Sequence, residues 1–370
     1  MKKGAVWLAT ATVAASLVVA GCGDDENSTS GGGGSSTADS GGDVGKVAVL
    51  LPDSKSSVRW ETYDRPLLKA AFQDAGVEAE IQNAEGDKAT QQQQAEQAIT
   101  NGAKVILLVN LDSGSGAAIE ANAKSQGVKV IDYDRLTLKS DATDYYVSFD
   151  NEKVGQLQGQ GIVDCMGDKK GAQVAVLNGS PTDNNATLFK QGYDSVIDPK
   201  FESGEWKKVD DQSVPDWDNQ KALTIFEQIL QKNGNKIDGV VAANDGLGNA
   251  AISALKQRKL PQVPVTGQDA TLQGIQNIVN GDQCMTVYKA IKKEADAAAK
   301  LAIALAKGET PSEQTTPVNN ETKDVPSILL EPVTVDKDTI KDYIGEPDFP
   351  KAEEICAGDL AAKCKEIGLQ

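Results

Sequence analysis

Short apolar runs rich in Val and Ile alternate, from residue 46 onward, with segments whose apolar residues recur at helical spacing. This alternation is typical of parallel strands joined by crossover helices, because helices then cover both faces of the sheet. The runs form two consecutive series of expected strands. The first is 46–51, 78–83, 104–109, 128–133 and 145–149; the second is 172–178, 206–210, 238–243, 263–267 and 284–288. We therefore predict an α/β fold with two doubly wound sheets.

The segments between the expected strands are amphipathic. In residues 217–233, for example, one helical face carries Leu223, Phe226, Ile229 and Leu230, and polar side chains occupy the opposite face. A chain of 370 residues is long for one domain and long enough to bury two hydrophobic cores. We expect two lobes, each with helices packed against its own sheet.

Charge and histidine content exclude several classes of function. The chain has 37 Lys and Arg against 54 Asp and Glu, and its net charge of -17 repels nucleic acid and anionic membrane surfaces. It has no histidine, which excludes Ser-His and Cys-His nucleophiles and His-ligated zinc. No G-x-x-x-x-G-K-[ST] loop is present, and residues 244–250 lack the G-x-G-x-x-G spacing. We expect no metal, no cofactor and no nucleic-acid partner.

The first 45 residues have the features of an export and anchoring segment. Residues 1–21 contain two lysines followed by an apolar run too short for a stable membrane span, which is typical of a signal peptide. The sequence "VVAGC" resembles the bacterial lipoprotein processing box, so Cys22 is expected to carry lipid; the alternative is an ordinary signal with a chance cysteine. Residues 22–45 form a Gly/Ser-rich flexible tether. We expect an exported protein that is periplasmic or anchored on the outer face of the membrane.

Four cysteines remain after Cys22. An even number in an exported chain favours disulfides over metal or redox work, although three pairings are possible. We favour Cys356 with Cys364, which closes a short loop near the C-terminus, and Cys165 with Cys284.

Polar clusters follow the strong strands directly. They occupy 52–60, 110–114, 134–135, 179–185, 244–245, 268–269 and position 289. In open parallel sheets, ligands bind in the crevice beyond the carboxyl ends of the strands, so these clusters are expected to converge on one site. Asn, Asp, Gly and Ser are also ordinary turn and helix-cap residues, and each cluster taken alone allows that interpretation.

The chemistry of these clusters favours a sugar as the ligand. Charged and amide side chains can donate and accept hydrogen bonds in several directions, as the hydroxyls of a sugar require. Trp60 and Trp217 add flat apolar faces for the C–H faces of a pyranose, although core packing is the alternative for both. Asp134 and Arg135 stand side by side at the end of a strand. We expect them to form a buried pair in which each holds the other for ligand binding.

Several segments resemble the type I periplasmic sugar-binding family, in its D-xylose-binding branch. They include "RWETYDR", "IDYDR", "GSPTDNNATLFKQG", "VTGQDATLQGI" and "MTVYK", and the resemblance spans roughly residues 46–345. It implies a substrate-binding subunit of an ABC importer, with two Rossmann-like lobes joined by three crossovers. The implied N-terminal lobe is 46–150 with 289–322, the C-terminal lobe is 151–288 with 323–345, and 346–370 is a tail.

The resemblance also implies a set of sugar ligands. From the first lobe and the last crossover these are Arg59, Trp60, Asp134, Arg135 and Lys289, and from the second lobe Asp183, Asn185, Trp217, Asn244 and Asp269. D-xylose is the expected ligand. The loop 52–60 differs from the xylose-binding form, which leaves glucose, galactose or arabinose as alternatives.

Two other functions are open to the same residues. A receptor of the same fold would present the bound sugar to a membrane sensor instead of an ABC transporter permease. A glycoside hydrolase would use Asp134 and Asp269 as paired carboxylates, but each has a basic or amide neighbour that keeps it ionised. We therefore expect a binding protein and not an enzyme. The absence of an apolar surface run favours a monomer.

Overall fold

The computed structural model describes residues 44–260 and 262–369. Cys22 and the expected signal peptide and tether up to residue 43 therefore lie outside the described residues. Within the described part of the chain, no helix is long and apolar enough to cross a membrane.

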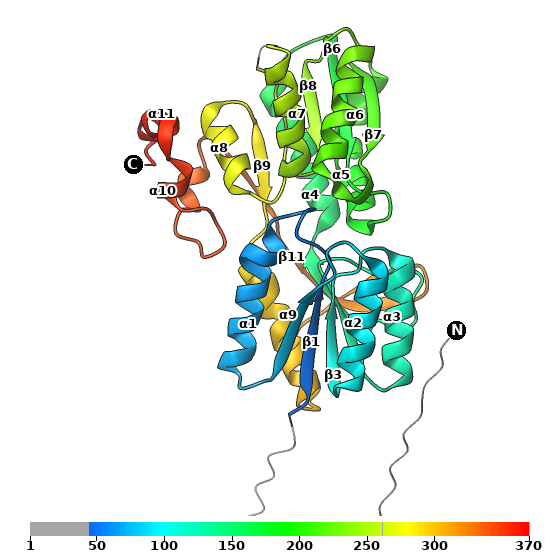
Figure 1. Ribbon diagram of the computed structural model, residues 1–370. Helices are drawn as coiled ribbons and strands as arrows, with labels where there is room; N and C mark the ends of the chain where they lie inside the picture. The colour runs from blue at the N-terminus through cyan, green and yellow to red at the C-terminus, as the bar shows by residue number, and fades with distance from the viewer. Residues whose placement is uncertain (1–43, 261, 370) are drawn as a thin grey trace, which may run out of the picture. The chain divides into compact units, whose positions relative to one another are not determined.

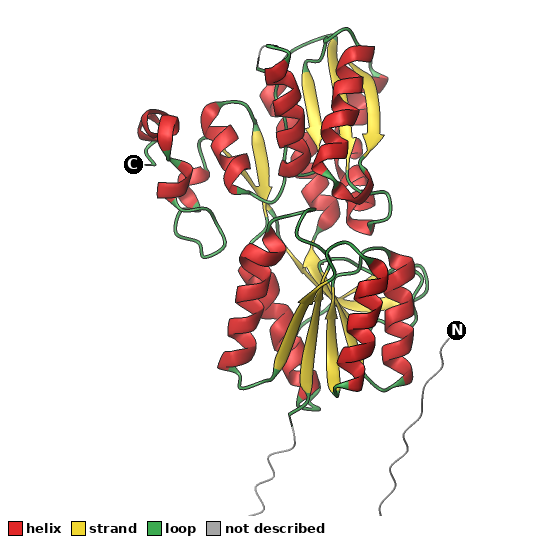
Figure 2. Cartoon of the chain, viewed as in Figure 1, coloured by secondary structure: helices red, strands yellow, loops and turns green. Residues whose placement is uncertain are grey.

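Five strands from the first half of the chain and two from near its end form a seven-stranded sheet (Figures 1 and 2). Its order is β10 (Thr316–Asn319), β11 (Asp324–Leu330), β5 (Tyr145–Phe149), β4 (Lys129–Tyr133), β3 (Ala103–Leu108), β1 (Lys46–Leu51) and β2 (Ala79–Asn83). All neighbours pair in parallel except β10 with β11. Its helices are α1 (Arg65–Asp74), α2 (Lys88–Thr100), α3 (Ser113–Ser125) and α9 (Ile291–Ala306), and a π-helical turn, Trp60–Asp64, precedes α1.

The strands of this sheet are buried on both faces, which explains their continuous apolar runs. In β1, Val47 and Val49 pack with residues of α1 and α9, whereas Ala48 and Leu50 pack with residues of α2 and α3. Successive side chains of a strand point to opposite faces, so one apolar run supplies two cores. The predicted doubly wound sheet is confirmed for this lobe.

A second parallel sheet follows in the order β7 (Trp206–Ser213), β6 (Ala172–Asn178) and β8 (Gly239–Ala242). The helices of this region are α4 (Asn151–Met166), α5 (Asn184–Glu202), α6 (Asn219–Lys232), α7 (Asp245–Gln257) and α8 (Leu272–Asn280). The short turn η2 (Pro215–Trp217) lies before α6. Side chains of α4 to α7 and of these strands share one apolar core. The apolar side chains of α8 belong to a separate cluster near the C-terminus.

The expected strand at 263–267 is present only as an isolated bridge between Val240 and Val265. Its backbone still links β8 to β9 (Met285–Tyr288), because Val240 N donates to Pro264 O and Cys284 N donates to Val265 O. Pro264 has no N–H to offer a ladder, which shortens the strand. β9 in turn pairs antiparallel with β12 (Val333–Asp336).

The boundary expected at residue 323 is wrong. Residues 323–345 were assigned to the C-terminal lobe, but β11 pairs in parallel with β5, from Ser327 with Tyr146 to Leu330 with Phe149. The β10–β11 hairpin thus completes the edge of the first sheet, and the chain leaves this sheet only after Leu330. A hairpin and a crossover contain the same turn residues, so the sequence pattern does not separate them.

The end of the chain folds into the short elements η3 (Ile340–Asp342), α10 (Ala352–Ile355), η4 (Gly358–Leu360) and α11 (Ala361–Glu366). Cys356 and Cys364 lie within disulfide distance, with Cα atoms 5.7 Å apart. Cys165 of α4 and Cys284 also lie within disulfide distance, with Cα atoms 6.3 Å apart. These are the two pairs that the sequence favoured.

Candidate functional site

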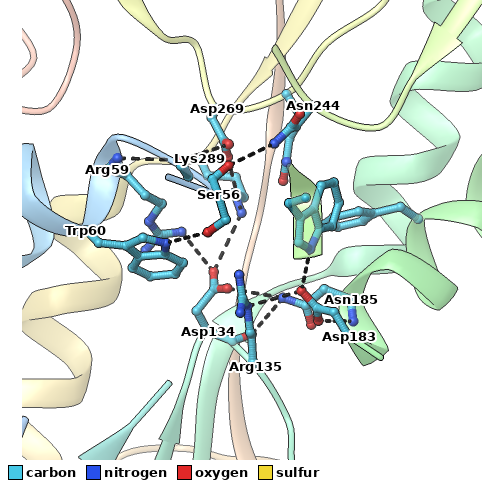
Figure 3. A pocket seen from close by; sticks show the side chains of 14 residues that line it. Ser56, Arg59, Trp60, Asp134, Arg135, Asp183, Asn185, Asn244, Asp269 and Lys289 are labelled. Carbon is cyan, nitrogen blue, oxygen red and sulfur yellow. Dashed lines mark hydrogen bonds and ion pairs between the residues drawn. The ribbon is translucent and has the colours of Figure 1, made fainter. Parts of the chain in front are cut away.

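The expected ligand residues converge on one cavity of about 320 Å³ (Figure 3). All ten sequence-predicted residues line it: Arg59, Trp60, Asp134, Arg135, Asp183, Asn185, Trp217, Asn244, Asp269 and Lys289. They come from both sheets and from the β9–α9 connection.

Strand ends and helix starts place these side chains. Asp134 and Arg135 directly follow β4, and Lys289 directly follows β9. Asp134, Trp217 and Asp269 have φ angles of 65°, 54° and 98°. Non-glycine residues with such φ values are uncommon and cluster at functional sites, where the surrounding structure holds the strained backbone.

Arg59 is the centre of a buried ion cluster. Its Nε and Nη2 donate to Asp64 Oδ2 and Oδ1 at 2.9 and 2.7 Å, Nη2 also donates to Glu294 Oε2 at 2.5 Å, and Nη1 donates to Asp134 Oδ2 at 2.8 Å. A guanidinium has five N–H donors. Four are used here, and the second N–H of Nη1 has no partner among the residues described. Arg59 is thus held firmly and keeps one donor for a ligand.

Asp134 joins the two lobes. Asn185 Nδ2 donates to its carbonyl oxygen at 2.9 Å and to Oδ1 at 3.2 Å, and Lys289 Nζ lies 3.6 Å from Oδ2. Burial alone would raise its pKa, but Lys289, Arg59 and Arg135 together hold the pKa of Asp134 below its ordinary value. The carboxylate of Asp134 is therefore ionised, and it lines the cavity as a hydrogen-bond acceptor.

Asp134 and Arg135 do not pair with each other, contrary to expectation. Adjacent side chains at the end of a strand diverge, and Arg135 Nε lies 3.1 Å from Asp183 Oδ2. Trp217 Nε1 donates to the same oxygen at 3.0 Å. The guanidinium carbon of Arg135 also lies 5.5 Å from the Trp60 ring centre, within cation–π range. Arg135 is thus fixed by the opposite lobe and by an aromatic ring.

Two of the predicted residues cap helices, as the turn-and-cap interpretation of their clusters expected, and both also line the cavity. Asp183 Oδ1 accepts from Asn185 N at the start of α5, and Asn244 Oδ1 accepts from Leu247 N at the start of α7. In each case the cap occupies one side-chain atom. Asp183 Oδ2 and the Asn244 amide nitrogen remain directed at the cavity (Figure 3).

Sequence reasoning missed two groups of residues. Ser56, Ser57, Phe189 and Gln268 also line the cavity. Sequence features could have identified them. Ser56 and Ser57 lie in the loop before Arg59, and Gln268 directly precedes Asp269. Phe189 follows Asn185 by four positions, which places both on one face of α5. Asp64 and Glu294 lie behind Arg59 and are fully buried. Among residues 44–260 and 262–369, no cluster of His, Cys, Asp and Glu is suited to hold a metal ion.

Glu294 gives a pH-dependent stability that can be tested. Burial raises its pKa to about 8, although Arg59 opposes the shift. Between the ordinary value of 4.5 and about 8, the folded protein keeps a proton that the unfolded chain releases. The free energy of unfolding therefore falls as pH rises through this window. We expect Glu294→Gln to remove this decline, on the order of 5 kcal/mol over the window, measured by urea unfolding at several pH values.

Glu309→Gln, at an exposed position just past α9, is the matched control and should follow the wild type. Asp245, whose pKa burial raises to about 7, titrates in all three proteins and so cancels in the comparison. Parallel pH curves for the wild type and Glu294→Gln would contradict the assignment.

Comparisons with known proteins agree with this geometry. A periplasmic binding protein domain family matches residues 47–310. The D-xylose-binding periplasmic protein of Escherichia coli is 40% identical over 311 residues, which covers 84% of this chain and 92% of that protein. A multiple sugar-binding periplasmic receptor of Rhizobium radiobacter is 34% identical over 332 residues, covering 85% and 93%.

Among solved structures, an ABC transporter solute-binding protein from Clostridium phytofermentans with bound β-D-glucose has a TM-score of 0.77 and 30% identity, covering 84% of this chain and 99% of that one. A carbohydrate transporter solute-binding protein from Chloroflexus aurantiacus in complex with D-glucose has a TM-score of 0.74 and 32% identity, covering 82% and 98%.

Proposed function

The chain belongs to the type I periplasmic sugar-binding family, and from this premise we propose that it captures a monosaccharide between two lobes and delivers it to an ABC importer. The observation that carries the proposal is the cavity, where a charged hydrogen-bonding network meets two indole rings. Ionised groups make the stronger hydrogen bonds to hydroxyls, and indole faces suit sugar C–H groups.

We propose D-xylose as the ligand, with glucose, galactose or arabinose as the alternatives. Two relatives named for D-xylose are 40% and 41% identical to the chain. The two neighbours with bound glucose are 30% and 32% identical, and the higher identity to the xylose-named relatives favours xylose over a hexose. Pentose and hexose pyranoses differ by one hydroxymethyl group, so the space beyond C5 decides between them.

Binding would operate by lobe closure. We assign 46–150 and 289–330 to the first lobe and 151–288 and 331–345 to the second. Direct contacts between these parts include Asn185 with Asp134, Arg135 with Asp183, and Ser57 with Asp269. A sugar that touches both lobes favours the closed form over the open one, and the importer would recognise that form.

A hydrolase using Asp134 and Asp269 is less well supported than a binding protein. Lys289 Nζ lies 3.6 Å from a carboxylate oxygen of each, and the pKa of Asp134 is lowered, whereas a general acid needs a raised pKa. The relatives are named as binding proteins. Release of nitrophenol from a nitrophenyl xyloside would overturn this choice.

We further propose export, a lipid anchor on Cys22, the disulfides Cys165–Cys284 and Cys356–Cys364, and a monomer. The relatives are periplasmic, an environment that allows disulfides to form. Peptide mapping without reduction should recover both linked peptides, and free thiols would remove the pairing. A role with a membrane sensor uses the same pocket, and loss of xylose uptake on deletion of the gene would favour import.

The class of ligand is tested by calorimetric titration of the purified protein with xylose, arabinose, ribose, glucose, galactose and a non-sugar polyol. We expect one-to-one binding to one or two aldoses, with xylose bound most tightly. Absence of binding to all five aldoses would refute the proposed function.

A further inference from the structure

The C-terminal tail, residues 346–369, packs against the connection that carries Lys289 into the sugar site. Phe349, Ile355, Cys356 and Cys364 are buried in one cluster with apolar residues of α8 and with Tyr288. The Phe349 and Tyr288 ring centres lie 5.3 Å apart with nearly perpendicular planes. The family match ends at residue 310, so the tail lies outside it.

Asp348 makes the contact that matters for the site. Its Oδ1 accepts from Tyr288 Oη at 2.9 Å, and its Oδ2 accepts from Lys292 N at 3.0 Å. Tyr288 and Lys292 flank Lys289 in the sequence. One buried carboxylate therefore accepts hydrogen bonds on both sides of the short segment that carries the Lys289 ammonium. Asp348 is only 3% exposed.

Helix α9 depends on this contact because its own N-cap residue is Ala290, which makes no side-chain cap. The first N–H groups of a helix need an acceptor, and Ser, Thr, Asp or Asn usually supplies it. Here Asp348 supplies it from 56 residues away in the sequence. Its negative charge also suits a helix N-terminus.

The tail is anchored far from this point as well. Gln276 Nε2 donates to Glu354 O at 2.9 Å, and Lys363 Nζ donates to Asn280 Oδ1 at 2.5 Å, so α8 holds the tail at two places. Cys356 follows the first anchor, Glu354, by two residues, Cys364 directly follows the second, Lys363, and the two cysteines lie within disulfide distance. The tail therefore presents Asp348 from a fixed support.

We propose that the tail is a strap that positions Lys289 for sugar binding through Asp348, without touching the sugar itself. The inference rests on the proposed function, because Lys289 matters only if the cavity binds a ligand. Its physical basis is preorganisation: an ammonium that is already in place loses less freedom when the ligand binds.

The test is the affinity of four single variants for D-xylose, or for the tightest aldose of the panel, by calorimetry. We expect Asp348→Ala to weaken binding about tenfold and Tyr288→Phe, which removes one hydroxyl, to weaken it less. Asp348→Asn should restore most of the affinity, because its amide oxygen can accept from Lys292 N while its NH₂ donates to Tyr288 Oη. Asp359→Ala, an exposed aspartate of the same tail, should stay within about twofold of the wild type.

A double-mutant cycle separates positioning from general stability. In a Lys289→Met background, Asp348→Ala should cause less than about a twofold further loss, because the ammonium that it positions is gone. An equal loss in both backgrounds, or unchanged affinity of Asp348→Ala, would overturn the inference and leave the proposed function intact. Failure of the wild type to bind any aldose would refute the proposed function and this inference with it.

Discussion

Asp134→Asn is expected to weaken sugar binding by about 3 kcal/mol, or roughly a hundredfold. The carboxylate of Asp134 accepts a hydrogen bond from Arg59 at 2.8 Å and forms an ion pair with the Lys289 ammonium at 3.6 Å. Without its charge, two buried cations lose a counter-charge and the sugar loses an ionised acceptor. Asparagine keeps the size of the side chain and tolerates the φ of 65° at this position, so the change tests the charge.

The matched control is Asp141→Asn, whose carboxylate is 73% exposed and pairs with Lys124 on the surface. Exposed pairs contribute little, so its affinity for sugar should equal that of the wild type. The comparison uses calorimetric dissociation constants together with melting temperatures. If Asp134→Asn bound sugar within about threefold of the wild type, Asp134 would not be a ligand of the kind described.

Arg135→Ala is expected to cost about 2–4 kcal/mol of binding free energy. Much of this loss comes from Asp183, which would remain buried without its partner at 3.1 Å. The rest comes from the guanidinium donors themselves and from their position 5.5 Å from the Trp60 ring centre. Arg135→Lys should recover only part of the loss, since an ammonium lacks the planar donor array.

Arg258→Ala is the control for this prediction, because Arg258 is exposed and its Nη1 contacts only Asn235 among the described side chains. A double variant with Asp183→Asn adds a second check: the two losses should be strongly non-additive, since the residues form one pair. A loss below tenfold for Arg135→Ala would exclude this role for Arg135.

The location of the site could be predicted from the sequence because it depends on local pattern. Asp134, Asn244 and Lys289 each come within two residues of the end of a strand. The carboxyl ends of parallel strands meet at one edge of a sheet, where ligands bind. Trp60 and Trp217 were identified because turns do not require indoles. Both also belong to the apolar cores, so the same rings pack in a core and line the cavity.

The pairing of side chains could not be predicted, because it depends on tertiary contacts. Arg59 meets Glu294 across 235 positions, and nothing near either residue indicates the other. Arg135 binds Asp183 across the lobes and not its neighbour Asp134, because rotamers and strand geometry set the direction of each side chain. The β10–β11 hairpin was misassigned for a related reason, since strand partners are chosen by the assembled sheet edge.

The proposed aldose would contact Trp60 and Trp217 in the cavity, and fluorescence titration with D-xylose tests this most directly. Trp206 lies in β7, outside the cavity, so Trp206→Phe retains the two indoles of the site. We predict a saturable one-to-one change in emission for the wild type and for Trp206→Phe, and none for the Trp60→Phe/Trp217→Phe double variant. A change that persists in the double variant, or no change in Trp206→Phe with any aldose, would contradict the account.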